Sequence, residues 1–435
     1  MYDLALKHGR IYYQGQFTHK HIYIEDEKIA LITDQERPAK TVFDATGKDV
    51  LPGIIDPHVH FALNVGSQTS VDDFYHGTVS GAFGGVTTII DFLDPVRNAD
   101  ELIDAYHQRC EAAKDSVIDY AFHATLKAPN GSLETFVKTM KSLHIHTLKV
   151  FTTYSESGRQ TQFEDIKTLL KLTKKYNFLL MVHVENDAMI SLDPAFTVKD
   201  LPKSRPEEAE ITEALNLAAL VKETGGKLYM VHTSSGRTIE ALKVYHESIL
   251  NTQFFIESCP QYFLFTEKNY HASDGYLYTC APPLRDDKAQ AKLFNNIELI
   301  DTIGTDHCSF LSHEKQRKRL IDIPLGLGGI EHSFVVMHHL FGDQIINKMT
   351  TRVAQLHQLK DKGKIDIGYD ADFMVMMPKN GFPIRETHTA SDYDLYLGHP
   401  GSGLITDTIV RGQFVVKNRQ LIIHSGHCIE RCDLL

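Results

Sequence analysis

The stretch Leu51-Pro-Gly-Ile-Ile-Asp-Pro-His-Val-His60 is a short apolar run that ends in two histidines separated by one residue. Side chains on a strand alternate between faces, so His58 and His60 should point the same way and could bind one metal ion. Two histidines that merely cap a buried strand are the alternative. The rest of the chain decides between these interpretations.

From Pro52 onward, apolar segments of strand length alternate about eight times with helix-length segments. Apolar residues at helical spacing in 165–176 and 206–224 are typical of amphipathic helices. Alternating strands and helices predict parallel strands, and eight such units fit a closed (β/α)8 barrel of the TIM type better than an open sheet. The expected strands are 54–61, 87–92, 119–125, 147–151, 178–184, 227–233, 254–260 and 300–307.

The two ends of the chain have a different pattern, in which short β segments are separated by turns. These segments fill the first fifty residues and return after about residue 354, with a hairpin turn at Gly412-Gln413. We therefore predict an α/β fold in which a small β-sandwich domain is formed from both termini. The predicted parts are 1–51 for the first half of the sandwich, 52–353 for a metal-dependent barrel, and 354–435 for the second half of the sandwich and a C-terminal tail.

The composition narrows the class of partner. The chain has 435 residues, with 45 Lys and Arg against 56 Asp and Glu, and its net charge of −11 argues against a nucleic-acid partner. The basic cluster Lys315-Gln-Arg-Lys-Arg319 is typical of a solvated loop or helix face. No apolar stretch approaches the ~20 residues of a membrane span, and the N-terminus has no secretion signal. These features indicate a cytoplasmic protein with no membrane partner.

The cysteines do not indicate a disulfide framework, because there are only six of them in so long a chain. The segment from His424 to Cys432 has a His and Cys spacing that could bind zinc. A surface tail is the favoured interpretation of this segment.

Ligand-type side chains stand at the predicted C-terminal ends of the strands, which is the face where catalytic groups of such barrels lie. They are His58, His60, Lys149, His183, His232 and Asp306. Imidazole nitrogen and carboxylate oxygen suit borderline divalent ions such as Zn²⁺. Lys149 is the odd member, because an ammonium group repels a cation. It is either a structural residue or a carbamate formed with CO₂, and its histidine neighbours favour the carbamate, which could bridge two metals roughly 3.5–4 Å apart.

Short motifs along nearly the whole chain carry a family resemblance. They are Pro52-Gly-Ile-Ile-Asp-Pro-His-Val-His60, Asp72-Asp-Phe-Tyr-His-Gly-Thr78, Gly84-Gly-Val-Thr-Thr-Ile-Ile-Asp91, Leu148-Lys-Val-Phe151, Val182-His-Val-Glu-Asn186, Val231-His-Thr-Ser-Ser235, Glu257-Ser-Cys-Pro-Gln-Tyr262, Pro282-Pro-Leu-Arg285 and Gly304-Thr-Asp-His-Cys308. Together they resemble the dihydropyrimidinase and hydantoinase branch of the amidohydrolase superfamily. The resemblance implies two divalent metal ions, with zinc as the default and manganese or cobalt as alternatives. It implies His58, His60, Lys149 and Asp306 around one metal, and N6-carboxylated Lys149, His183 and His232 around the other.

The resemblance also implies a reaction, which is hydrolysis of a C–N bond in a cyclic amide or ureide. A dihydropyrimidine or hydantoin ring would open to an N-carbamoyl amino acid through attack by a metal-bridging hydroxide. Asp306 is expected to act as general base and then as general acid, and Tyr154 matches the tyrosine that faces the developing oxyanion. The alternatives are a mere ligand or helix cap for Asp306 and a packing aromatic for Tyr154. His307 should face away by alternation and support the site.

The catalytic set does not select among hydantoins, dihydropyrimidines, allantoin and dihydroorotate. Relatives that bind a substrate carboxylate, such as dihydroorotases, have arginine at the fifth position of His-x-His-x-Arg; Ala62 stands there in this chain and disfavours dihydroorotate. By resemblance, the residues expected to bind substrate are Tyr154, Ser258, Ala281 and Leu325. Ala281 and Leu325 replace the family's usual Ser and Asn at positions that bind largely through main-chain groups. Apolar Leu325 favours a substituted hydantoin over plain dihydrouracil.

Two rival functions stay open. An allantoinase or another cyclic amidohydrolase would share the catalytic residues, and an activity panel would separate it from a hydantoinase. Some relatives are non-catalytic scaffolds, but the complete set of ligand-type residues argues against this alternative. The resemblance further suggests a homo-oligomer, a tetramer or dimer, that acts on a small cyclic amide.

Overall fold

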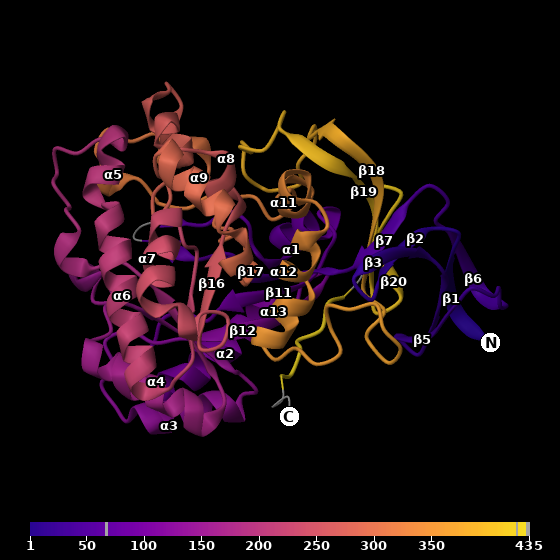
Figure 1. Ribbon diagram of the computed structural model, residues 1–435, viewed down its shortest axis with the longest axis horizontal. Helices are drawn as coiled ribbons and strands as arrows, with labels where there is room; N and C mark the ends of the chain where they lie inside the picture. The colour runs from indigo at the N-terminus through magenta and orange to yellow at the C-terminus, as the bar shows by residue number, and fades with distance from the viewer. Residues whose placement is uncertain (66–67, 423–424, 432–435) are drawn as a thin grey trace.

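The computed structural model describes residues 1–65, 68–422 and 425–431. Figure 1 shows a barrel surrounded by helices and, beside it, sheets in which indigo N-terminal strands and yellow C-terminal strands lie together. Strands from the N-terminal and C-terminal parts of the chain therefore lie together on one side of the barrel.

Eight parallel strands form the barrel sheet, in the order β8-β11-β12-β13-β14-β15-β16-β17. They are β8 (Ile54–Val59), β11 (Val86–Phe92), β12 (Asp119–Thr125), β13 (Thr147–Phe151), β14 (Leu179–His183), β15 (Leu228–Met230), β16 (Phe254–Ser258) and β17 (Thr302–Ile303). The first strand meets the last through a parallel bridge between Val59 and His307, where the His60 N–H donates to His307 O at 2.8 Å. The predicted (β/α)8 barrel is confirmed.

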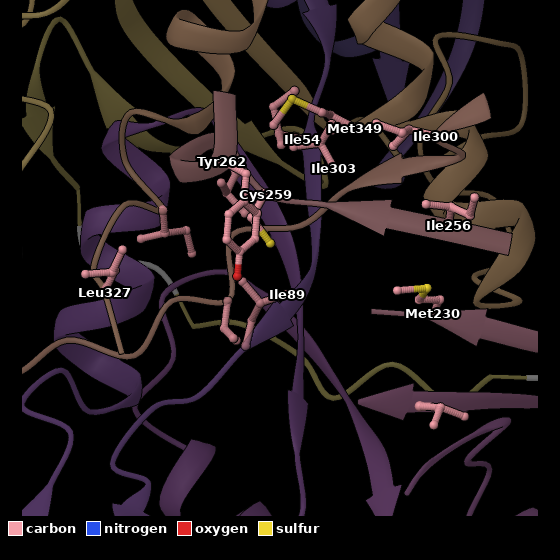
Figure 2. Packing of buried hydrophobic residues seen from close by; sticks show 14 of the residues in the cluster. Ile54, Ile89, Met230, Ile256, Cys259, Tyr262, Ile300, Ile303, Leu327 and Met349 are labelled. Carbon is pink, nitrogen blue, oxygen red and sulfur yellow. The ribbon is translucent and has the colours of Figure 1, made fainter. Parts of the chain in front are cut away.

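The barrel strands are buried on both faces, as parallel strands covered by helices require. Every residue of β11 and β12 is buried. Figure 2 shows Ile54, Ile89, Met230, Ile256 and Ile303, which come from five different strands and belong to one hydrophobic core.

Each strand is followed by a helix on the outside of the barrel. The longer helices are α1 (Phe74–Phe83), α2 (Ala99–Ala113), α3 (Leu133–Ser142), α4 (Phe163–Tyr176), α6 (Glu207–Thr224), α7 (Gly236–His246), α9 (Asp287–Asn295) and α11 (Ser333–Phe341). Shorter ones are α5 (Leu201–Ser204), α8 (Pro260–Leu264), α10 (Ser312–Lys315), α12 (Gln344–Lys348) and α13 (Thr351–Leu356). Local sequence explains their ends: the Asn98 side chain caps α2 by accepting from Glu101 N, and Gly225 ends α6 with a left-handed backbone.

Two further sheets form the terminal domain. One has the order β5 (Lys28–Thr33), β4 (His21–Glu25), β1 (Tyr2–Lys7), β6 (Ala39–Asp44), and the other has the order β21 (Gln420–Leu421), β20 (Gln413–Lys417), β19 (Pro400–Val410), β18 (Phe373–Pro383), β7 (Asp49–Pro52), β2 (Arg10–Tyr13), β3 (Gln16–His19). The N-terminal and C-terminal parts of this domain are joined in the larger sheet, where Val375 of β18 pairs with Val50 of β7. One hydrophobic core contains Leu6 and Ile24 of the smaller sheet together with Val50 and Phe373 of the larger. The predicted terminal β domain is confirmed.

Short connections link the two domains and their strands. Only Gly53 separates β7 from the first barrel strand, and a Cβ atom there would lie 2.2 Å from the Thr87 hydroxyl oxygen. The hairpin between β19 and β20 turns at Arg411-Gly412, where both residues have positive φ, one position before the predicted turn.

The C-terminal tail lies on the surface at His427 and Glu430, which are exposed, but it also pairs with the barrel, and the interpretation as a surface tail is wrong for Arg431, which is buried. Tyr120 N donates to His427 O at 3.0 Å, and Ile429 N donates to Tyr120 O at 2.7 Å, so the tail pairs with β12. The Arg431 guanidinium is fully buried and donates to Thr147 Oγ1 at 3.0 Å and to Phe122 O. His424 and Cys432 of the alternative zinc site lie outside the described residues.

The predicted limits of the three parts, 1–51, 52–353 and 354–435, stay a prediction, and α13 crosses the second of them. Within the described ranges, none of the helices is both long and apolar enough to cross a bilayer.

Candidate metal centre

A cavity of about 430 Å³ opens at the C-terminal ends of the barrel strands. Five of the predicted ligand residues line it: His60, Lys149, His183, His232 and Asp306. The sixth, His58, is fully buried beside them. The structure therefore brings all six residues to one place, although they are spread over the 249 positions from His58 to Asp306.

His58, His60 and Asp306 form one half of the site. Their ligand atoms all lie within 4.8 Å of one another. Asp306 Oδ1 is 3.2 Å from His58 Nε2 and 3.3 Å from His60 Nε2. His58 Nε2 is buried and makes no hydrogen bond in the described chain, as is typical of a nitrogen that binds a metal ion.

His183 and His232 form the other half. His183 Nδ1 lies 3.0 Å from His232 Nε2. Their rings, 4.6 Å apart and inclined at 71°, present these two nitrogens to the same space. His183 is the last residue of β14, as predicted, whereas β15 ends two residues before His232.

Two buried glutamates orient the imidazoles. Glu257 Oε1 is 2.7 Å from His58 Nδ1, and Glu185 Oε2 is 2.6 Å from His183 Nε2. A carboxylate accepts hydrogen bonds, so each neutral ring has its proton on that nitrogen and its lone pair on the other, facing the site. Sequence reasoning missed both roles, although the spacing His183-x-Glu185 already placed the pair on one face of an extended segment.

Asp306 lies beyond the end of its strand, in a left-handed backbone conformation with φ of 53°. Asp56 fixes this position, because its carboxylate accepts hydrogen bonds from the His58 and Thr305 N–H groups, both at 3.1 Å. Burial opposes ionisation of Asp306, but the positive charge that His58 carries when it is protonated, together with the close polar contacts from His58 and His60, outweighs burial and holds the pKa of Asp306 well below its usual range. Asp306 is therefore a carboxylate held against the histidines.

Tyr154 lines the cavity beside His183, with ring centroids 5.0 Å apart. The Arg205 guanidinium lies 4.8 Å from the tyrosine ring centroid and pairs with Glu185, the carboxylate that orients His183. Burial raises the pKa of Tyr154 to about 12, so its hydroxyl keeps its proton at neutral pH and can donate a hydrogen bond.

His307 supports the site and does not face the metal ligands, as expected. Its Nε2 is 2.9 Å from Asp72 Oδ2, and its Nδ1 accepts from Gly329 N at 3.1 Å. The ring therefore joins the strand end to the 326–330 loop.

Residues 50–415 match the Amidohydrolase family. The chain belongs to this family. A D-hydantoinase from Geobacillus stearothermophilus is 30% identical over 97% of this chain and 94% of its own length. A D-phenylhydantoinase from Escherichia coli O81 (strain ED1a) is 32% identical over 86% of this chain and 85% of its own.

Solved structures of a dihydropyrimidinase and a D-hydantoinase have a fold similar to that of this chain. The crystal structure of dihydropyrimidinase from Brevibacillus agri superposes on this amidohydrolase with a TM-score of 0.91 at 28% identity, over 99% of both chains. A D-hydantoinase from Thermus sp. gives a TM-score of 0.92 at 28% identity, over 98% of this chain and 99% of that one.

Amidohydrolases depend on metals, and the donors in this chain fit divalent cations. The two histidine pairs present nitrogen lone pairs, and Asp306 presents a carboxylate oxygen. Lys149 also lines the cavity and is 2% exposed, with no carboxylate within ion-pair distance among the described residues. Burial lowers the pKa of Lys149 to about 8, which increases the fraction of neutral amine. An unpaired buried ammonium is costly, so this position suits a modified lysine.

Of the four residues predicted to bind substrate, Tyr154, Ala281 and Leu325 line the cavity and Ser258 does not. The cavity lining also includes the aliphatic side chains of Leu192, Leu201, Leu320 and Ile323, called here the aliphatic wall. Ser258 is not among the lining residues, because its side chain is buried and donates to Thr233 O at 2.8 Å. The Ser258 hydroxyl is therefore used in a structural hydrogen bond, and a contact of Ser258 with substrate stays a prediction.

Proposed function

We propose that the chain is a binuclear metal-dependent cyclic amidohydrolase that opens hydantoin or dihydropyrimidine rings to N-carbamoyl amino acids. The observation that carries the proposal is the convergence of four imidazoles, Asp306 and an unpaired buried lysine on one cavity. Hydantoinases and dihydropyrimidinases that match nearly the whole chain support the substrate class.

Carboxylation of Lys149 would complete the ligand set. The neutral ε-amine attacks the carbon of CO₂, an N–C bond forms, and one proton leaves the nitrogen. The product is an anionic carbamate with two oxygens, which suits a position shared by two cations, for which zinc is the default. His58, His60 and Asp306 would hold one cation with the carbamate, and His183 and His232 would hold the other.

The cations, when bound, supply Lewis acidity that activates water and polarises the ring carbonyl near neutral pH. Asp306 accepts a proton from the attacking water and returns it to the ring nitrogen as the C–N bond breaks. The Tyr154 hydroxyl donates a hydrogen bond to the former carbonyl oxygen as negative charge develops there. The peptide groups of Ala281 and Leu325 bind the ring amide.

The cavity wall favours a ring with an apolar substituent. Leu192, Leu201, Leu320, Ile323 and Leu325 line the same cavity as the metal ligands. Burial of apolar surface contributes roughly 25 cal/mol per Å². A 5-aryl hydantoin should therefore bind better than dihydrouracil, which has no substituent to place against this wall.

A substrate panel tests the proposal. Purified protein loaded with Zn²⁺, Mn²⁺ or Co²⁺ is assayed with 5-phenylhydantoin, hydantoin, dihydrouracil and allantoin, before and after treatment with a chelator. The expected result is opening of a hydantoin or dihydropyrimidine ring, lost with the chelator and restored by metal. Turnover of allantoin alone would indicate an allantoinase. Absence of both bound metal and turnover would indicate a scaffold and overturn the proposal. A homo-oligomer and a cytoplasmic location stay predictions.

A further inference from the structure

Lys315 is buried although it opens the basic cluster Lys315–Arg319. It ends α10 and is 0% exposed, whereas residues 316–319 are exposed. The interpretation of this cluster as solvated is therefore right for its last four residues and wrong for the first. A buried lysine requires an explanation, because lysine is among the residues least often fully buried.

The Lys315 ammonium joins two loops of the cavity. Its Nζ donates to Thr279 O at 2.9 Å and to Gly326 O at 2.5 Å. The two loops also touch directly, through a hydrogen bond from Gly326 N to Thr279 O at 3.1 Å. The Lys315 side chain thus links loops 279–282 and 325–326 through their main-chain carbonyl groups.

No carboxylate of the described chain lies within ion-pair distance of Lys315, so charge neutralisation does not explain its burial. Burial lowers the pKa of this lysine to about 7. Both the ammonium and the neutral amine have at least two N–H groups, so either form can donate to the two carbonyls.

The peptide groups beside these carbonyls are free. Ala281 lies two residues after Thr279, and Leu325 precedes Gly326; both line the cavity. In the part of the chain that the structure describes, no hydrogen bond uses the N–H or C=O group of either residue. The loop at Gly326 is also tightly seated, since a Cβ atom there would lie 2.6 Å from Cys308 O.

We propose that Lys315 is a positioning residue that sets the distance between the Ala281 and Leu325 peptide groups, which bind the ring amide of the substrate. It acts through Thr279 O and Gly326 O and touches neither substrate nor metal ligands. This inference rests on the proposed function.

The test compares Lys315→Met with Lys318→Met, which makes the same change on an exposed lysine of the same cluster. Kinetic constants are expressed per metal-loaded site, with 5-phenylhydantoin and dihydrouracil as substrates. For Lys315→Met we expect KM to rise roughly tenfold for both substrates, because both contain the ring amide, while kcat falls less than about threefold. Metal content should be unchanged, and Lys318→Met should behave like the unmodified protein.

A purely structural role would lower the yield or the melting temperature of Lys315→Met but leave KM per loaded site unchanged, and that result would overturn the proposal. A KM increase confined to 5-phenylhydantoin would also overturn it, since the wall and not the ring amide would then be affected. If Lys315→Met does not fold, Lys315→Gln is measured in the same way. Failure of the unmodified protein to open any cyclic amide would count against the proposed function instead.

Discussion

His307 Nε2 and Asp72 Oδ2 lie 2.9 Å apart, and this buried pair connects the end of the last barrel strand to the segment before α1. Asp72 also accepts from Ser309 Oγ at 2.6 Å and from Ala390 N at 2.7 Å. One carboxylate thus holds together three segments from different parts of the sequence.

Asp72→Asn should destabilise the protein by about 3 kcal/mol, because charge-assisted hydrogen bonds are lost and an amide N–H₂ is turned toward donors. The midpoint of urea unfolding measures this loss. Asp73→Asn is the matched control: Asp73 caps α1, and Asn caps helices about equally well.

The loss should also depend on pH. Burial opposes ionisation of Asp72, but the hydrogen bond from His307 and its other partners hold the pKa well below its usual range. A carboxylate whose pKa is depressed in the folded protein stabilises the fold at pH values above its unfolded pKa of about 3.9. This stabilisation is lost as the pH falls through the folded pKa. The difference between Asp72→Asn and the unmodified protein should therefore shrink below about pH 4. A constant difference would contradict this account.

Asp306→Asn should retain the fold and lose catalysis, because an amide cannot carry the proton from water to the ring nitrogen. We expect kcat to fall by about 10²- to 10⁴-fold. Circular dichroism and metal content verify the fold and the site, and Asp193→Asn, on an exposed aspartate, serves as control. Unchanged turnover by Asp306→Asn would show that another group moves the proton.

Lys149→Ala should lose one or both metals and nearly all turnover, because the shared anionic ligand is gone. Partial recovery is expected when short carboxylic acids are added with metal, since a free carboxylate can occupy the vacated position. Elemental analysis and the ring-opening assay measure the two effects. Full metal content in Lys149→Ala would contradict the carbamate role.

Glu257→Gln should weaken metal binding roughly 10- to 100-fold, because the amide orients the His58 ring less firmly than the carboxylate does. Glu257 also accepts from the His232 N–H at 3.0 Å, so both halves of the site should be affected. Titration with a competing chelator measures the affinity. Glu298→Gln, on an exposed glutamate, should show no change.

Leu325→Asn should reduce the preference for 5-phenylhydantoin over dihydrouracil by roughly tenfold in kcat/KM, since it removes apolar surface from the wall. Both substrates are measured with both proteins, so that a general loss of activity, which lowers kcat/KM for both substrates equally, is distinguished from a change in preference. A clear preference of the unmodified protein for dihydrouracil would contradict the role of the wall.

Sequence periodicity was sufficient to predict the barrel and to place His58, His60 and His183, because these residues belong to fully buried strands of five or six residues or follow them directly. His232 and Asp306 lie beyond shorter strands, with φ values of 39° and 53°, and strand alternation does not predict such positions. The roles of Glu257 and Glu185 depend on which imidazole nitrogen faces them, which only three-dimensional geometry specifies. Lys315 escaped prediction because its partners are backbone carbonyls, which leave no pattern in the side chains.

The pairing of residues 427–431 with β12 has a consequence for how the molecule is made. Arg431 is 309 positions from Phe122, the residue whose carbonyl it caps. A ribosome releases the β12 segment long before the residues that complete its lower edge. During synthesis, the edge of β12 at Tyr120 therefore stays unpaired until residues 427–431 are made. A chain shortened before His427 should be cleaved more readily by proteases near β12.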